Sequence, residues 1–101
     1  SMEVGDAFQS RGGSKFTCLK IDEKGNHWII RASTGKVLKI TARSIGRVKE
    51  RIERGEEFKF QKNPPDGGLS YTIAIEAALA AICNLQPDTS ARVYRAPEAE
   101  E

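Results

Sequence analysis

The chain has 101 residues, of which 39% are apolar and 30% charged, values typical of one ordinary globular domain. No apolar run approaches the ~20 residues that a membrane helix requires, and the first residues lack the basic start and apolar stretch of a signal peptide, so we expect a cytoplasmic protein with no membrane partner. The formal net charge of +2 permits a nucleic-acid partner without requiring one.

Three segments are expected along the chain. Residues 1–13 contain few apolar anchors and predict a loosely packed lead-in, in which Ser1 before Met2 is typical of a residue left by cloning. Residues 14–95 are expected to form a single α+β domain. Residues 96–101 consist of Ala, Pro and Glu, a composition that predicts a disordered acidic tail. With that tail set aside, the remaining chain is more basic than the whole.

Residues 14–22 are β-rich in type, but their apolar residues do not alternate strictly. Phe16 and Cys18 fall on one face of an ideal strand, whereas Leu19 and Ile21 fall on the other. A β-bulge, or burial on both faces, would explain this pattern. We therefore expect an irregular first strand.

Two further strands, at 27–32 and 37–41, alternate with a period of two and follow short turns that contain glycine. Together with the first strand they predict an antiparallel meander. The residues expected to face the helices are Trp28, Ile30, Leu38 and Ile40. The residues expected to face away are His27, Arg31 and Lys39.

The period becomes helical from Ala42 to Ile52. Thr41 or Ser44 is expected to cap the start of this helix, and Gly55 to supply its C-terminal stop. The apolar stripe of the helix consists of Ala42, Ile45, Val48 and Ile52.

Residues 57–61 return to a period of two and predict a fourth strand, whereas the Pro- and Gly-rich residues 61–68 predict a loop. A second helix is expected from about residue 70 to 84. Its alanine-rich sides are so smooth that we expect burial, either in the domain's own core or against a partner. Residues 92–95 predict a short edge strand. The large side chains of the second helix are Ile75, Leu79 and Ile82.

The predicted fold class is therefore α+β: a small antiparallel sheet in the order β-β-β-α-β-α, with two helices packed on one face. A meander followed by a helix is also the layout of several small DNA-binding domains that insert a sheet in the major groove. That analogy concerns architecture alone.

Metal and cofactor chemistry has little support. Cys18 and Cys83 lie far apart in apolar surroundings, which predicts small buried residues with free thiols. Together with His27, the only histidine, they cannot build a zinc site. The pair Gly35-Lys36 lacks the neighbours of a phosphate-binding loop. We expect no metal, no small-molecule cofactor and no catalytic activity.

Glu57 and Lys59 form the Glu-x-Lys fragment found on strands of metal-dependent nucleases. A second carboxylate would have to come from Asp66, in the following loop, or from Asp22. Because such a fragment arises easily by chance on the wet face of a strand, we prefer that explanation to a nuclease site.

Glu76 is the only charge in the second helix. We interpret Glu76 as marking the one solvent-exposed line along that helix. The alternatives are a partly buried partner for Arg92 or Arg95, and a functional acid.

Two basic surfaces are candidates for phosphate contacts. One is the arginine face of the first helix, where Glu50 is spaced to pair with part of the row. The other is the sheet face turned away from the helices, which Lys20 joins if the first strand bulges; with no exposed aromatic expected there, stacking of single-stranded bases is not predicted. The alternative for both is an ordinary solvated face. The candidate nucleic-acid-binding residues are Arg11, Lys15, Lys20, Arg31, Lys36, Lys39, Arg43, Arg47 and Arg51.

We predict a nucleic-acid-binding module that contacts double-stranded DNA through the backbone. The alternative is a small protein-interaction domain: an adaptor, an inhibitor, or a homodimer formed through the alanine-rich second helix. The loop at 61–72 is a further candidate for binding residues, or a simple connection.

Overall fold

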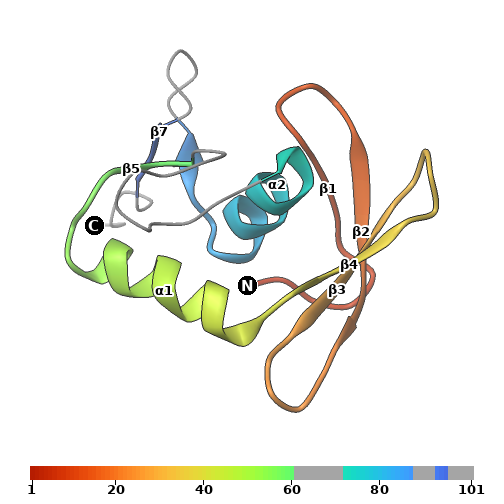
Figure 1. The fold of residues 1–101 in the computed structure, drawn as a ribbon, viewed down its shortest axis with the longest axis horizontal. Coiled ribbons are helices and arrows are strands. Elements are labelled where there is room, and N and C mark those ends of the chain that lie inside the picture. Colours follow the sequence, from red (N-terminus) through yellow and green to blue (C-terminus); the bar gives the residue numbers. More distant parts are fainter. Residues whose placement is uncertain (61–71, 88–92, 96–101) are drawn as a thin grey trace.

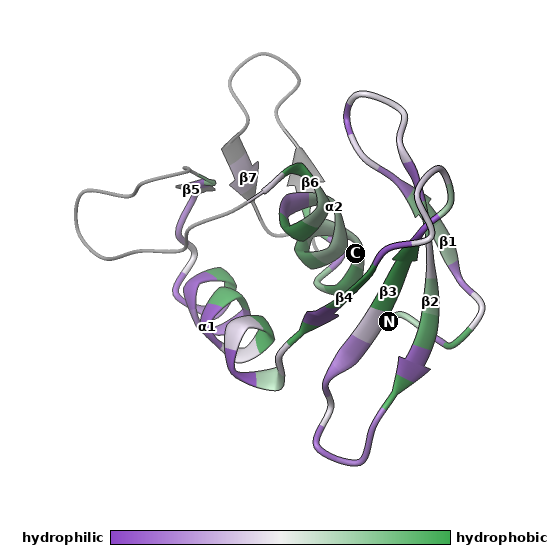
Figure 2. Cartoon of the chain, turned by 45° about the vertical axis from the view of Figure 1, so that its right-hand side comes forward, coloured by the Kyte–Doolittle hydropathy of each residue, from purple (hydrophilic) through white to green (hydrophobic). Residues whose placement is uncertain are grey.

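The computed structural model describes residues 1–60, 72–87 and 93–95. Its main element is a four-stranded antiparallel sheet in the order β1-β2-β3-β4, and both helices lie on the same side of this sheet (Figures 1 and 2). The α+β class and the packing of both helices on one face are therefore confirmed. The strands of this sheet are β1 (Ala7–Gln9), β2 (Lys15–Ile21), β3 (His27–Arg31) and β4 (Val37–Ile40).

A second, smaller sheet lies beside the helices and has the order β5-β7-β6. The expected fourth strand is the two-residue β5 (Phe58–Lys59), and it joins this second sheet rather than the meander. The expected edge strand at 92–95 is β7 (Val93–Arg95), which is central rather than an edge because β6 (Gln86–Pro87) pairs with its other side.

The N-terminal lead-in is part of the sheet. Ala7–Gln9 pair with β2 as strand β1, and the Phe8 ring stacks on Phe16 with 5.4 Å between centroids. Met2 also packs against the core. The scarcity of apolar residues before residue 14 concealed this strand, since a three-residue edge strand needs only one inward anchor.

The two helices begin at threonine caps. Helix α1 (Ala42–Glu53) follows Thr41, whose side-chain oxygen accepts a hydrogen bond from the Ser44 backbone N–H at 3.1 Å, and it ends before Gly55 at φ +72°. Helix α2 (Ile73–Ile82) follows Thr72, which caps it in the same way. Of the two caps expected, Thr41 and Ser44, the helix uses Thr41, and the stop at Gly55 is as predicted. Helix α2 is shorter at both ends than the range expected.

Strand β2 contains the expected bulge, and the bulge determines which residues face the helices. Cys18 pairs with Ile29 and Lys20 pairs with Trp28, so Leu19 is the extra residue. The bulge shifts the alternation by one residue, which turns Ile21 to the same side as Phe16 and Cys18. The irregular apolar pattern of this strand is therefore one inward face interrupted by a bulge.

The expected orientation of β3 was wrong. Ile29 is fully buried in the core, so its neighbours Trp28 and Ile30 point to the side of the sheet away from the helices. His27 and Arg31, which were expected to face away, lie on the inner side with Ile29. Both alternating sets of this strand contain an isoleucine, and the alternation alone therefore favoured neither face.

Helix α2 lies in the core of the domain. Ala78 and Leu79 are essentially inaccessible, and they pack in one cluster with Ile29, Ile45 and Val48. Figure 2 shows α2 as mostly hydrophobic, whereas α1 alternates between hydrophobic and hydrophilic residues. Over the described ranges, neither helix has the length and apolar character needed to cross a membrane.

The assignment of the sheet faces can be tested with two neighbouring isoleucines. We expect Ile29→Ala to lower the free energy of unfolding by about 2–5 kcal/mol, because it leaves a cavity in the core. Ile30→Ala, on the outer side, should cost only ~1 kcal/mol. Urea unfolding of both variants measures the difference, and a larger loss at Ile30 would reverse the assignment.

Candidate nucleic-acid interface

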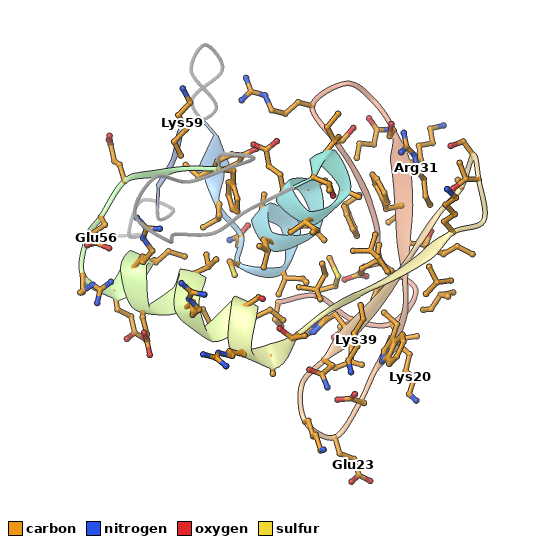
Figure 3. All side chains as sticks on the ribbon, in the orientation of Figure 1. Lys20, Glu23, Arg31, Lys39, Glu56 and Lys59 are labelled. Carbon is orange, nitrogen blue, oxygen red and sulfur yellow. The ribbon has the colours of Figure 1, made fainter. Side chains whose placement is uncertain are left out.

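The outer side of the four-stranded sheet carries a tryptophan between two lysines. Trp28 lies on β3, directly opposite Lys20 of β2 and Lys39 of β4. The Nζ atoms of Lys20 and Lys39 lie 5.8 and 5.2 Å from the centroid of the ring, within cation–π range. Figure 3 shows the two lysines beside each other near the β2–β3 hairpin. We call these three residues the lysine–tryptophan row.

Contacts from both neighbouring strands hold the Trp28 ring in place. Because β3 lies between β2 and β4, one lysine reaches the ring from each side. The indole N–H is buried and has no hydrogen-bond acceptor in the part of the chain that the structure describes. Packing and the two cations, rather than a hydrogen bond, therefore position the ring.

A second row of side chains runs across the outer side next to the lysine–tryptophan row. The backbone register places its members opposite one another on the four strands, and each side chain ends in a methyl group. Val37 is 50% exposed, and the bulged Leu19 nearby is 46% exposed. We call this row the methyl row, and its members are Ala7, Thr17, Ile30 and Val37.

The lysines of the outer side lack ion-pair partners in the part of the chain that the structure describes. Lys15, Lys20 and Lys39 are exposed, and none of them has an ion pair within residues 1–60, 72–87 and 93–95. Asp22, in the β2–β3 turn, interacts electrostatically with Lys39. Its carboxylate is occupied locally, since Oδ1 accepts hydrogen bonds from the backbone N–H groups of Lys24 and Asn26, and Oδ2 accepts one from the Asn26 side chain.

Two residues expected on this side belong to the inner side. The Arg31 guanidinium lies 5.8 Å from the centroid of the buried Phe16 ring and donates a hydrogen bond to the Ser14 hydroxyl at 2.8 Å. The His27 ring has Nδ1 at 2.9 Å from the Gly25 carbonyl oxygen. Conversely, Trp28 lies on the outer side, where no aromatic side chain was expected.

The remaining basic residues lie elsewhere. Lys36 and Arg11 are exposed in the β3–β4 and β1–β2 turns. On α1, Arg43 and Arg47 are exposed. Glu56 forms ion pairs with two arginines: its Oε2 atom lies 3.5 Å from Nε of Arg51 and 3.2 Å from Nη2 of Arg54.

The arginine face of α1 and the outer side of the sheet do not form one surface. Helix α1 lies on the inner side of the sheet and packs Ile45 and Val48 into the core, so its arginines point away from the sheet. Glu56, which engages two arginines at the end of this helix, lies on the far side of the molecule from Lys20 and Lys39 (Figure 3). The nine candidate residues therefore do not form one surface. Lys15, Lys20 and Lys39 lie on the outer side of the sheet, and the other six lie on its inner side, in turns or on α1.

Glu76 is buried, so the expectation of a solvated line on α2 was wrong. Only 3% of the residue is exposed, and it lies in the first turn of the helix. Together with Arg11, Ser10 and Tyr94 it lines a cavity of about 360 Å³ between the β1–β2 loop and α2. Negative charge is favourable at this end of a helix. The side chains of the two arginines considered as its partners, and the loop at 61–71, lie outside the described residues.

The structure brings no metal-ligand cluster together. Among the described residues there is no group of three or more His, Cys, Asp or Glu side chains that could hold an ion. Glu57 and Lys59 are exposed near β5, whereas the turn that contains Asp22 lies at the opposite end of the molecule (Figure 1). Asp66 lies outside the described residues.

Both cysteines are free. Burial raises the pKa of the Cys18 thiol and of the Cys83 thiol, so both are poor nucleophiles at neutral pH. Cys18 is buried as expected, whereas Cys83 is only half-buried.

Searches of protein-family models, of curated proteins and of solved structures found no match to this chain.

The Asp22 turn predicts a pH dependence of stability. The hydrogen bond from the Asn26 side chain, with smaller contributions from backbone N–H groups and Lys39, lowers the pKa of Asp22 below 3.8. A lowered pKa in the folded state stabilises the protein above pH 3.8, and this stabilisation is lost as the pH falls through the folded-state pKa. We expect Asp22→Asn to show a smaller drop in Tm between neutral pH and strong acid than the unmodified protein. Equal drops in thermal scans would contradict this.

Proposed function

We propose that this protein binds double-stranded DNA through the outer side of its four-stranded sheet. The observation that carries the proposal is the lysine–tryptophan row, in which Lys20 of β2 and Lys39 of β4 flank Trp28 and form no ion pair among the described residues. Lysines that neutralise phosphates release condensed counterions, and this release supplies most of the non-specific affinity for DNA. Lys15 adds a third cation on the same side.

Duplex DNA fits this surface better than a single strand. Binding of single strands relies on bases that stack on open aromatic faces. Here the two lysines lie over the Trp28 ring, and the rings of Phe16, Phe60 and Tyr94 are buried. Among the described residues, the outer side thus offers cations and methyl groups rather than an open stacking platform.

The alternative, a protein-interaction domain, has less support in its homodimer form. That form uses the small side chains of α2 as a surface for a second helix, and Ala77 and Ala78 of this helix pack within the domain's own core. The arginine face of α1 is a weaker phosphate surface, because Arg51 and Arg54 already engage Glu56.

The proposal can be tested by titrating the protein with a mixed-sequence duplex at several salt concentrations. Trp28 is the only tryptophan, so its fluorescence reports directly on this surface. We expect binding that weakens steeply with salt. The double variant Lys20→Gln/Lys39→Gln should bind more weakly and reduce the slope of log K against log salt by about 2, because each phosphate contact contributes about 0.9.

The matched control is Lys49→Gln/Lys59→Gln, which removes the same charge from α1 and β5. It should retain most of the affinity and the full change in Trp28 fluorescence. Equal losses in the two double variants would mean that net charge, not the lysine–tryptophan row, carries the binding. No binding of the duplex at low salt would overturn the proposal.

A further inference from the structure

The dimensions of the outer side match those of a DNA groove. Neighbouring strands lie about 4.8 Å apart, so β2 and β4 are separated by roughly 10 Å across β3. The major groove of B-DNA is about 12 Å wide. If the three strands follow the groove, Lys20 and Lys39 stand on the two strands nearest its walls, where the phosphates lie, with their ammonium groups over the Trp28 ring in the free protein. The rest of the outer side then faces the floor of the groove.

The residues that would then meet the bases are those of the methyl row. Thr17, Ile30 and Val37 lie on β2, β3 and β4 at one level of the sheet. None of these side chains offers the bidentate pattern with which Arg, Asn or Gln reads guanine or adenine. Their methyl groups are complementary to the one apolar group that the major groove presents, which is the C5-methyl of thymine.

We infer that the methyl row recognises C5-methyl groups in the major groove, so that the protein prefers thymine-containing duplexes over the same duplexes without those methyls. This inference rests on the duplex binding proposed above. Charge complementarity selects the occupant: the methyl row is bordered by Lys15 on one side and by the lysine–tryptophan row on the other, and no acid on the outer strands opposes them. A purely apolar partner would leave these lysines without counter-charge.

The test compares one duplex rich in A·T pairs with the same duplex in which deoxyuridine replaces every thymidine. The two have the same charge and the same hydrogen-bonding groups, and differ only in the C5-methyls. We expect the uracil duplex to bind about fourfold more weakly for each contacted methyl group, the change produced by the loss of one buried methyl. Affinities are measured at one fixed salt concentration through Trp28 fluorescence.

A variant pair links the effect to the methyl row. Val37→Ser removes two methyl groups from a residue that is 50% exposed and should reduce the ratio between the thymine and uracil affinities. Ile73→Ser changes a residue that is 58% exposed at the start of α2, on the other side of the sheet, and should leave the ratio unchanged.

The outcomes separate this inference from the proposed function. Equal affinity for the two duplexes, with salt-dependent binding intact, would overturn the recognition of methyl groups and leave duplex binding standing. Absence of binding to both duplexes would overturn both. Sedimentation of the free protein completes the test, since a dimer that Val37→Ser dissociates would make the methyl row a contact between two copies of this chain and would also overturn the inference.

Discussion

Burial of Ile29 is the constraint that orders the whole sheet. Side chains alternate along a strand, so one fully buried residue on β3 decides the side of Trp28, Ile30 and every residue paired with them. The bulge at Leu19 keeps β2 in register with this choice, since without it Lys20 would face the core and Ile21 the solvent. The basic outer side is therefore a consequence of the way the core is packed.

The same core packing determines which faces of the two helices are buried and which are exposed. Helix α2 buries Ala77, Ala78, Leu79 and Ile82 in the core, which explains a composition that would be unusual for an exposed helix. Helix α1 is amphipathic and covers the remaining edge of the core. Asn26 connects the β2–β3 hairpin to helix α1. Its side-chain N–H donates a hydrogen bond to Asp22, and its side-chain oxygen accepts one from the Ala42 backbone N–H at 2.8 Å. The β2–β3 hairpin and the start of α1 thus hold each other in place.

Local chemistry made part of this fold predictable from the sequence. The cap at Thr41, the stop at Gly55 and the bulge in β2 follow from interactions within a few residues. The side of β3 did not follow, because choosing between Ile29 and Ile30 requires knowing what packs on each face. The burial of Glu76 was hidden for the same reason, because a single charge in a helix does not indicate what packs around it. Tertiary packing decides each of these cases.

The composition of the candidate interface follows from which side of β3 faces the core. With the opposite orientation of β3, the outer side would have combined Arg31 and Lys39 and lacked an aromatic ring; the observed side combines Lys20 and Lys39 with Trp28. A free lysine side chain has ~2 kcal/mol of rotamer entropy, part of which it loses when it contacts a phosphate. Contact with the Trp28 ring already restricts both lysines before any ligand arrives, which reduces the entropic cost of binding. The ring therefore holds two ammonium groups close together on this side of the sheet.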